Sequence, residues 1–228
     1  MSRIERLNET YKLLKEAERE YRANPNNSDL ANNYTRYLRA CMMDVYAPSQ
    51  GSHNELLYCK TFLNSLTEVY RKHFNNEEIA FDYLCGIAYI PEYVEGNAVE
   101  QMLEIIRRFP NNDEMKQYCC MGLYLLATRY DNRGDLSNAE CVVKYLKMLY
   151  DRYPTNDAII HEYARTLWHI YRNKGFFVKR KAVAELKKIV EQHPDEQTME
   201  WYRATKNYGA YYKEEMKKAE QRNRELFG

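Results

Sequence analysis

The residues best suited to metal or acid–base chemistry lie together in the C-terminal half of the chain. The run HEYAR places His161 beside Glu162 and begins like a helix that binds zinc through histidines at positions i and i+4. Arg165 stands where the second histidine would be required. His169 could share a helical face with His161, but two imidazoles without a third ligand make a weak site. We therefore predict no metal site.

Other residue types that carry enzyme chemistry also lack partners in the sequence. Neither a glycine-rich phosphate loop nor a Gly-x-Ser-x-Gly motif occurs. The six cysteines form no Cys-x-x-Cys pair, and adjacent residues such as Cys119 and Cys120 point about 100° apart on a helix. They are expected as thiols in a reduced interior. The acidic pair Glu77 and Glu78 is explained more simply as a helix start. We predict no catalytic residue, no cofactor and no enzyme activity.

The clearest pattern in the chain is a repeated phrase. It reads ANPNNSDL at 23–30, HFNNEEIA at 73–80, RFPNNDEM at 108–115, RYPTNDAI at 152–159 and QHPDEQTM at 192–199. One anchor residue in each copy sets a spacing of 49, 36, 44 and 40 residues; the anchors are Pro25, Phe74, Pro110, Pro154 and Pro194. Pro and Asn end one helix, and the following Asn, Asp or Glu can cap the next. Each copy therefore predicts a helix end, a tight turn and a new helix start.

Large or apolar residues recur at fixed distances before each anchor. Eleven positions before it are Leu14, Leu63, Val99, Val143 and Val183. Eight positions before it are Ala17, Leu66, Met102, Leu146 and Leu186. Four positions before it are Tyr21, Tyr70, Ile106, Tyr150 and Val190. This spacing puts them on one stripe of a helix, and repeats of this length with two amphipathic helices are typical of solenoids.

This frame resembles the tetratricopeptide repeat over about residues 10–205. In that family the second helix ends shortly before a proline, with apolar residues at similar distances before it. The first helix matches less closely, because Tyr163, Ala164 and Leu167 stand where the family has Leu, Gly and Tyr. The resemblance implies an all-α fold, a right-handed α-solenoid of tetratricopeptide-like helical hairpins with elongated helices and a long C-terminal capping helix.

The low content of helix-breaking residues, 8 Gly and 6 Pro among 228, also favours long helices. We expect one helical-repeat domain over residues 1–228, with an exposed loop at 46–54. Its leading helix is expected at about 3–22 and its final helix at about 196–226. Four hairpins should lie between these helices, at about 28–73, 77–109, 112–153 and 156–193.

The resemblance also implies a binding groove, because the first helices of successive hairpins line the concave face in this family. Trp, Tyr and Arg are frequent hot spots of protein binding, which favours a protein or peptide partner. The residues at these groove positions are Asn32, Arg36, Arg39, Phe81, Cys85, Tyr89, Gln117, Met121, Tyr124, His161, Arg165, Trp168, His169, Trp201, Thr205 and Tyr208. The alternative is that the aromatic residues pack against neighbouring helices. The family's Lys and Asn pattern that grips a peptide C-terminus is absent.

Charge is uneven along the chain, although the formal net charge is +1. Residues 1–114 carry 13 Lys/Arg and 18 Asp/Glu, whereas the remainder carries 21 and 15. The densest basic stretch is 174–188, beside Phe176 and Phe177; its cations are Lys174, Lys179, Arg180, Lys181, Lys187 and Lys188. Such a stretch either binds phosphates or an acidic partner, or is a solvated helix face.

These patterns predict a non-enzymatic scaffold or adaptor that binds a peptide or protein segment on its concave face. The alternative is a nucleic-acid-associated regulatory protein that uses the basic stretch 174–188. No segment approaches the ~20 apolar residues of a membrane span, and no signal-type stretch begins the sequence, so we expect a cytoplasmic protein without a membrane partner. The opposite charges of the two halves also permit self-association.

Overall fold

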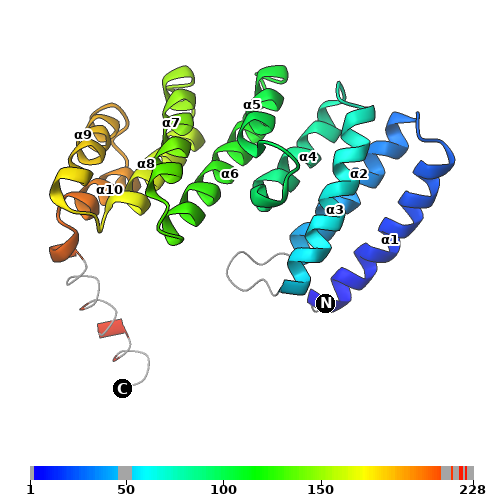
Figure 1. Cartoon of the computed structure of the whole chain (residues 1–228), viewed down its shortest axis with the longest axis horizontal. Coiled ribbons are helices and arrows are strands. Elements are labelled where there is room, and N and C mark those ends of the chain that lie inside the picture. The colour runs from blue at the N-terminus through cyan, green and yellow to red at the C-terminus, as the bar shows by residue number, and fades with distance from the viewer. Residues whose placement is uncertain (1–2, 46–52, 212–216, 218–220, 223, 225–228) are drawn as a thin grey trace. The chain divides into compact units, whose positions relative to one another are not determined.

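The computed structural model describes the chain except for residues 1–2, 46–52, 212–216, 218–220, 223 and 225–228. The described residues form helices joined by short turns, with no β-strand among them (Figure 1). In chain order the elements are α1 (Arg3–Ala23), α2 (Ser28–Val45), α3 (His53–Lys72), α4 (Glu77–Tyr89), the 3₁₀ helix η1 (Pro91–Tyr93), α5 (Ala98–Arg108), α6 (Asp113–Asn132), α7 (Leu136–Arg152), α8 (Asp157–Tyr171), α9 (Phe176–Gln192) and α10 (Glu196–Lys206). The all-α class predicted from the sequence is confirmed.

The predicted bounds of the leading helix and of the four hairpins agree with the observed ones to within one residue, but the prediction differs at the C-terminus. There the sequence predicted one helix to about residue 226, whereas α10 ends at Lys206 and, among the described residues beyond it, 208–211, 217, 221, 222 and 224 are again helical. The C-cap Asn207 has φ −125° and ψ 47°, outside the helical region, so the predicted helix is interrupted at this residue. The unpredicted η1 follows α4 because Pro91 has no N–H with which to continue the α-helical ladder. Residues 46–52 of the predicted loop lie outside the described residues.

The repeated phrase forms the turns between hairpins as the sequence predicted. In each copy an Asn or Asp one or two positions after the anchor accepts a backbone N–H of the new helix. Asn76, for example, accepts from the N–H of Ile79 at 3.2 Å. The other residues in this capping role are Asn27, Asn112, Asn156 and Asp195. The phrase is therefore a capping device that satisfies donors at the start of five helices.

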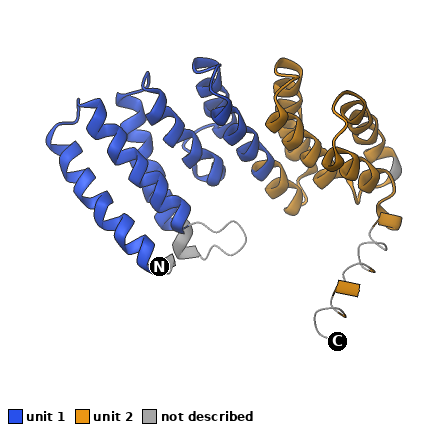
Figure 2. Ribbon diagram, turned by 180° about the vertical axis from the view of Figure 1, so that it is seen from behind, with its two compact units in different colours: residues 1–125 blue, residues 126–228 orange. Residues whose placement is uncertain are grey.

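The chain divides into two compact units, residues 1–125 and residues 126–228 (Figure 2). The sequence predicted a single domain, because it contains no segment that resembles a linker between domains. The boundary lies inside α6, a continuous helix, three residues after Gly122 and near the change of charge balance at residue 114.

In unit 1, helix α2 packs against α1, α3 and α4, and α4 packs against α3 and α5. The predicted apolar stripe forms much of its core; buried members are Leu14, Ala17, Leu63, Leu66, Met102 and Ile106. Helix α6 approaches α4 closely at Gly122. A Cβ atom there would lie 2.8 Å from the Cα atom of Ala88, so this contact requires glycine.

In unit 2, helix α8 is central and packs against α7, α9 and α10. Its inward face is apolar and fully enclosed; buried residues on it are Ile159, Ile160, Tyr163, Ala164, Leu167 and Ile170. The same stripe positions as in unit 1 supply the facing side chains, including Leu146 on α7 and Leu186 on α9. Both units are thus built by the same spacing of apolar residues.

Tyrosine pairs recur between consecutive hairpins. Tyr70 on α3 stacks on Tyr83 on α4, with ring centroids 4.7 Å apart and an interplanar angle of 24°. Equivalent pairs, four positions before and nine after an anchor, are Tyr21 with Tyr34 and Tyr150 with Tyr163, each with centroids 5.4 Å apart. The tyrosines at these two positions therefore contact one another in three places, which accounts for part of the excess of 22 Tyr over 7 Phe.

Five of the six cysteines are buried, and Cys141 is exposed. The prediction of thiols inside the fold is therefore correct for all but Cys141. Among the described helices, none contains an apolar stretch long enough to cross a bilayer.

Candidate functional site

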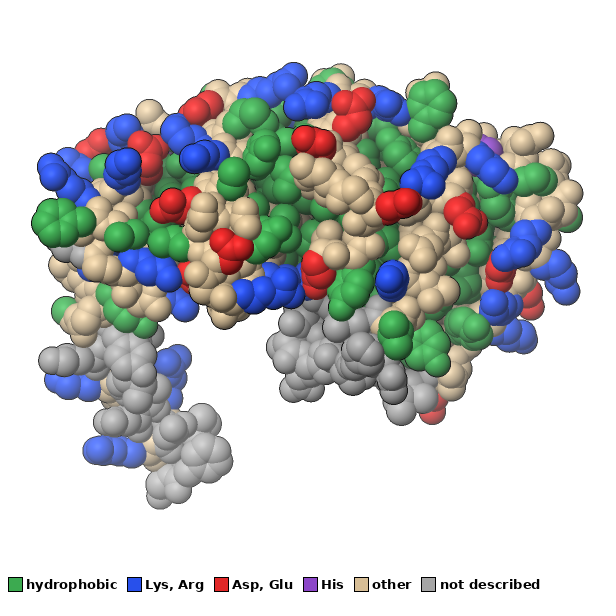
Figure 3. Space-filling model, viewed as in Figure 1, with side chains coloured by type: hydrophobic (Ala, Val, Ile, Leu, Met, Phe, Trp, Pro, Cys, Tyr) green, Lys and Arg blue, Asp and Glu red, His purple; other side chains and the backbone are tan. Residues whose placement is uncertain are grey.

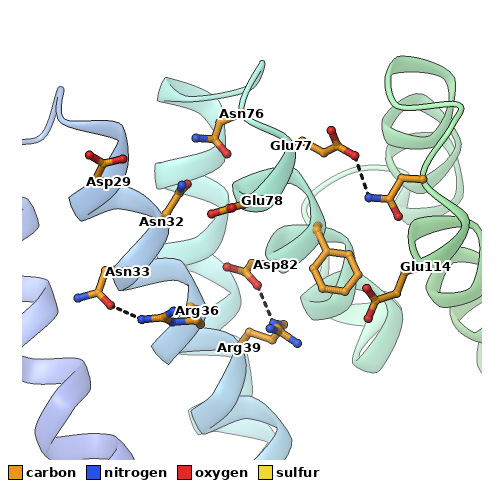
Figure 4. Close-up of a pocket in the computed structure, with 12 residues that line it drawn as sticks. Asp29, Asn32, Asn33, Arg36, Arg39, Asn76, Glu77, Glu78, Asp82 and Glu114 are labelled. Carbon is orange, nitrogen blue, oxygen red and sulfur yellow. Dashed lines mark hydrogen bonds and ion pairs between the residues drawn. The ribbon is translucent and has the colours of Figure 1, made fainter.

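A cavity of about 1080 Å³ opens on the face of unit 1 where α2, α4 and the first turn of α6 meet (Figure 4). It is larger than the cavity of about 510 Å³ beside α3 and η1. We call it the α2–α4 pocket; it is lined by Asp29, Asn32, Asn33, Arg36, Arg39, Asn76, Glu77, Glu78, Phe81, Asp82, Asn112 and Glu114. Spacings of three and four residues place the α2 members on one helical face, and the same holds for Glu78 and Asp82 on α4. Four residues predicted to lie in the groove line this pocket: Asn32, Arg36, Arg39 and Phe81.

An ion pair joins α2 to α4 inside the pocket. The Nε atom of Arg39 donates to Oδ1 of Asp82 at 2.6 Å, and the hydroxyl of Thr35 donates to Oδ2 at 2.8 Å. Asp82 is only 4% exposed, and burial raises the pKa of its carboxyl, against the opposing hydrogen bond of Thr35 and the charge of Arg39. These two donors compensate a carboxylate that would otherwise be costly to bury.

Phe81 forms an aromatic wall beside this ion pair. Its ring lies 5.1 Å from the guanidinium carbon of Arg39 and meets the ring of Tyr118 edge-to-face, with centroids 5.4 Å apart. Phe81 is half-buried. The cation–π contact and the ion pair together fix the guanidinium in one orientation. Arg39 is therefore part of the pocket wall and is not available as a cation for a ligand.

Most of the remaining charge in the pocket is negative. Five carboxylates line it against two guanidinium groups, and the second guanidinium, that of Arg36, donates to Oδ1 of Asn33 at 2.8 Å. Glu77 accepts from Nδ2 of Asn112 at 2.9 Å. Three exposed carboxylates form neither an ion pair nor a side-chain hydrogen bond with any residue that the structure describes: Asp29, Glu78 and Glu114.

Asn32 adds an unsatisfied acceptor to the pocket lining. Its side-chain Oδ1 atom is buried and has no hydrogen-bond partner among the described residues. The hydroxyl of Thr35 reaches only its backbone carbonyl, at 3.1 Å. An unpaired buried acceptor costs about 1–3 kcal/mol, so a rearrangement that gives this oxygen a donor would be favourable.

The other unit 1 residues assigned to the groove do not line this pocket. Gln117 is exposed on α6, Tyr89, Met121 and Tyr124 are half-buried, and Cys85 is fully buried. Burial raises the pKa of Tyr89 to about 12, so its hydroxyl stays protonated at neutral pH. These residues belong to the same helices as the pocket but not to its wall.

In unit 2, two residues of the predicted groove contact each other: His161 on α8 and Trp201 on α10. The Nε2 atom of His161 lies 3.3 Å from Oδ2 of Asp195, and its ring meets that of Trp201 edge-to-face at 6.1 Å. Trp201 is only 8% exposed, and Thr205, a further predicted groove residue on α10, is fully buried. The alternative stated for the aromatic residues, packing between helices, therefore describes Trp201, which offers little surface to a partner. Tyr208 is half-buried beyond α10.

Three further residues of the predicted groove, Arg165, Trp168 and His169, lie further along α8. Arg165 donates to Glu162 at 3.3 Å, and burial raises the pKa of the Glu162 carboxyl despite the charge of Arg165. Trp168 is half-buried beneath the guanidinium of Arg172, whose carbon lies 4.3 Å from the ring centroid. The indole Nε1 of Trp168 is buried without a hydrogen-bond partner among the described residues. Burial, followed by the charge of Arg172, lowers the pKa of His169.

The predicted basic patch separates into paired and unpaired cations on or beside α9. Three of its lysines have acidic partners: Lys174 with Asp131 at 2.8 Å, Lys188 with Glu185 at 3.0 Å and Lys187 with Glu191 at 3.5 Å. The other three, Lys179, Arg180 and Lys181, make no ion pair within the described chain. They follow Phe177, which is 86% exposed, near the start of α9. The N-cap residue of this helix is Gly175, which has no side chain to accept a backbone N–H. Figure 3 shows basic and acidic side chains scattered among hydrophobic ones on the visible face.

Metal and thiol chemistry find no support in this geometry. Within the described residues no three His, Cys, Asp or Glu side chains are grouped as metal ligands. Burial raises the pKa of Cys41 to about 11 and raises the pKa values of Cys85 and Cys119 further, so these thiols are poor nucleophiles at neutral pH.

The acidic residues of the pocket were not predicted from the sequence. Asp82 follows Phe81, and Glu78 lies four residues before Asp82, so an acidic i, i+4 pair beside a groove position was the available signal. No protein-family model, curated protein or solved structure matches the chain.

Proposed function

We propose that this protein is a non-enzymatic interaction scaffold that binds a peptide or protein segment in the α2–α4 pocket. In this proposal the hairpins are tetratricopeptide-like units of a right-handed α-solenoid, and the first helices of its hairpins present the binding face. A cytoplasmic location and an adaptor role belong to the same proposal. It rests on the repeat frame and on the side chains that this face presents.

One observation carries this proposal. The pocket is lined by side chains from the first helices of three consecutive hairpins, α2, α4 and α6, and it combines amides, charges and an aromatic wall. Amide side chains can hydrogen-bond an extended backbone, while the charged groups and Phe81 supply side-chain selectivity. A segment that crosses several helices fits this arrangement better than a small metabolite, whose sites are usually enclosed and mostly apolar.

The test is a selection of binding peptides from a random library displayed on phage, with the full chain as target. Enriched peptides would be measured by fluorescence anisotropy against the wild type and against Asn33→Trp, which fills the pocket without changing charge. Asn64→Trp is the matched control, because Asn64 is an exposed asparagine on α3. We expect binding to fall about tenfold or more with Asn33→Trp and to persist with Asn64→Trp. Equal affinity for all three proteins would contradict a binding role for the pocket.

A second candidate function is nucleic-acid binding at the start of α9, favoured by Phe177 and the three unpaired cations. An exposed aromatic ring can stack on a base while neighbouring cations contact phosphates. Binding of labelled single-stranded RNA should then weaken steeply as salt rises. It should be lost when Lys179, Arg180 and Lys181 are all changed to Gln. A variant with Lys187→Gln and Lys188→Gln is the control, and equal losses in the two variants would argue against this candidate.

A further inference from the structure

The α2–α4 pocket holds more negative charge than its own cations neutralise. Arg39 is paired with Asp82, whereas Arg36 donates to the neutral amide of Asn33 and keeps its charge, so five carboxylates still face two guanidinium groups. The carboxylates of Asp29, Glu78 and Glu114 are left without a cation in the described structure. Each lies in the first turn of its helix, where a carboxylate complements the helix dipole. The dipole accounts for each position separately, but it does not account for three carboxylates around one cavity.

The arrangement of these carboxylates indicates what kind of cation they could receive. A single metal ion needs ligands grouped around one point, and no such group of three occurs among the described residues. The three carboxylates instead come from α2, α4 and α6 in turn. Separate cations spaced along one flexible chain match this distribution, since each can reach its own carboxylate.

Two other residues that line the pocket suit the uncharged parts of a flexible basic segment. Phe81 presents an apolar wall against which the methylene groups of Arg or Lys side chains can pack. The side chain of Asn32 also lines the cavity, and an amide can exchange hydrogen bonds with the backbone of a bound segment. The pocket thus combines acceptors and negative charge, a complement to a donor-rich, positively charged ligand.

We propose that the segment bound in the α2–α4 pocket is basic, an extended stretch whose Arg or Lys side chains pair with Asp29, Glu78 and Glu114. This inference rests on the proposed binding function of the pocket and adds the chemistry of the partner. The pairing sets selectivity through charge complementarity, which rejects acidic segments by repulsion as well as attracting basic ones.

The experiment measures fluorescence anisotropy of short labelled Gly–Ser peptides that carry Arg, Gln or Glu at alternate positions, with the full-length protein. The wild type should bind the Arg peptide, bind the Gln peptide at least about tenfold more weakly and not bind the Glu peptide. Affinity for the Arg peptide should fall as salt rises, because exposed charge pairs are screened.

Two variants of equal net charge separate pocket binding from general attraction. The pocket variant carries Asp29→Asn, Glu78→Gln and Glu114→Gln. The control variant changes three exposed acids outside the pocket in the same way: Glu16, Glu20 and Glu68 to Gln. We expect the pocket variant to lose about threefold in affinity per neutralised carboxylate and the control to keep wild-type affinity. Circular dichroism confirms that both remain folded.

The outcomes distinguish the inference from the function on which it rests. If the Gln or Glu peptide binds as tightly as the Arg peptide, or if both triple variants lose affinity equally, the basic partner is wrong. The binding function itself survives that result as long as Asn33→Trp abolishes the binding of library-selected peptides. If neither the Arg peptide nor any selected peptide responds to Asn33→Trp, the proposed function fails as well.

Discussion

Arg39 on α2 and Asp82 on α4 form a nearly enclosed ion pair, with Nε and Oδ1 2.6 Å apart. Their side chains are 25% and 6% exposed. The pair joins the first helices of two successive hairpins, and it also shapes the wall of the α2–α4 pocket. One contact therefore contributes both to the packing of unit 1 and to the surface on which its proposed function depends.

We expect Arg39→Ala to destabilise unit 1 by about 3 kcal/mol, because it leaves the buried Asp82 carboxylate without its cation. Urea denaturation followed by circular dichroism measures this loss. The same substitution in an Asp82→Asn background should cost clearly less, because no buried charge is then left unpaired. If the two costs are equal, the residues are not energetically coupled.

Gly122→Ala should destabilise the protein by about 1–3 kcal/mol, because the added Cβ atom would lie 2.8 Å from the backbone of Ala88 and 2.8 Å from Sδ of Met102. The helices must then move apart. Gly209→Ala is the control, since nothing lies within 4 Å of a Cβ atom at that position. Thermal denaturation of both variants gives the comparison, and a similar Tm for the two would show that the close approach at Gly122 is unimportant.

The stacked pair Tyr70 and Tyr83 should show a coupling energy of about 1 kcal/mol in a double-mutant cycle with leucine. Each single variant also loses other contacts, such as the hydrogen bond from the Tyr83 hydroxyl to Oε1 of Gln101, and the cycle cancels these. Urea denaturation of the four proteins supplies the free energies of unfolding. Additive losses would mean that the stacking of the rings adds nothing beyond their burial.

Stability should fall on mild acidification because of His169. Burial, and then the charge of Arg172, lowers its pKa from 6.5, although Asp131 acts in the opposite sense. The stability that neutral His169 provides is complete above the unfolded pKa and is lost as pH falls through the lower folded pKa. Between about pH 7 and about pH 5, His169→Gln should therefore lose less stability than the wild type. Parallel losses in urea denaturation at the two pH values would exclude this role.

The predicted stripe and turns were correct where local chemistry decides the structure. Leu66 and Leu186 lie eight positions before their anchors and are fully buried, because helical periodicity alone puts such residues on the inward face. Asn76 and Asn156 cap helices because a short side chain at that position can accept a nearby N–H. These relationships involve neighbours in sequence, and so they could be read from it.

The groove prediction was less complete because it depended on which first-helix side chains meet across helices. Arg36, Arg39 and Phe81 do line a pocket, but Trp201 packs against His161 and is nearly enclosed. Whether an aromatic residue at a groove position faces solvent or a neighbouring helix depends on the distance between the helices. The spacing of residues within one helix does not determine the distance to the next helix.

By itself the sequence determined the all-α class, nearly all helix bounds and the capped turns, because propensity, periodicity and capping act over a few residues. Only the tertiary structure decided the division inside α6, the pairing of Arg39 with Asp82 and the gathering of Asp29, Glu78 and Glu114 around one cavity. These features join residues tens of positions apart. Their geometry follows from how the helices pack, which depends on side-chain volumes at many contacts at once.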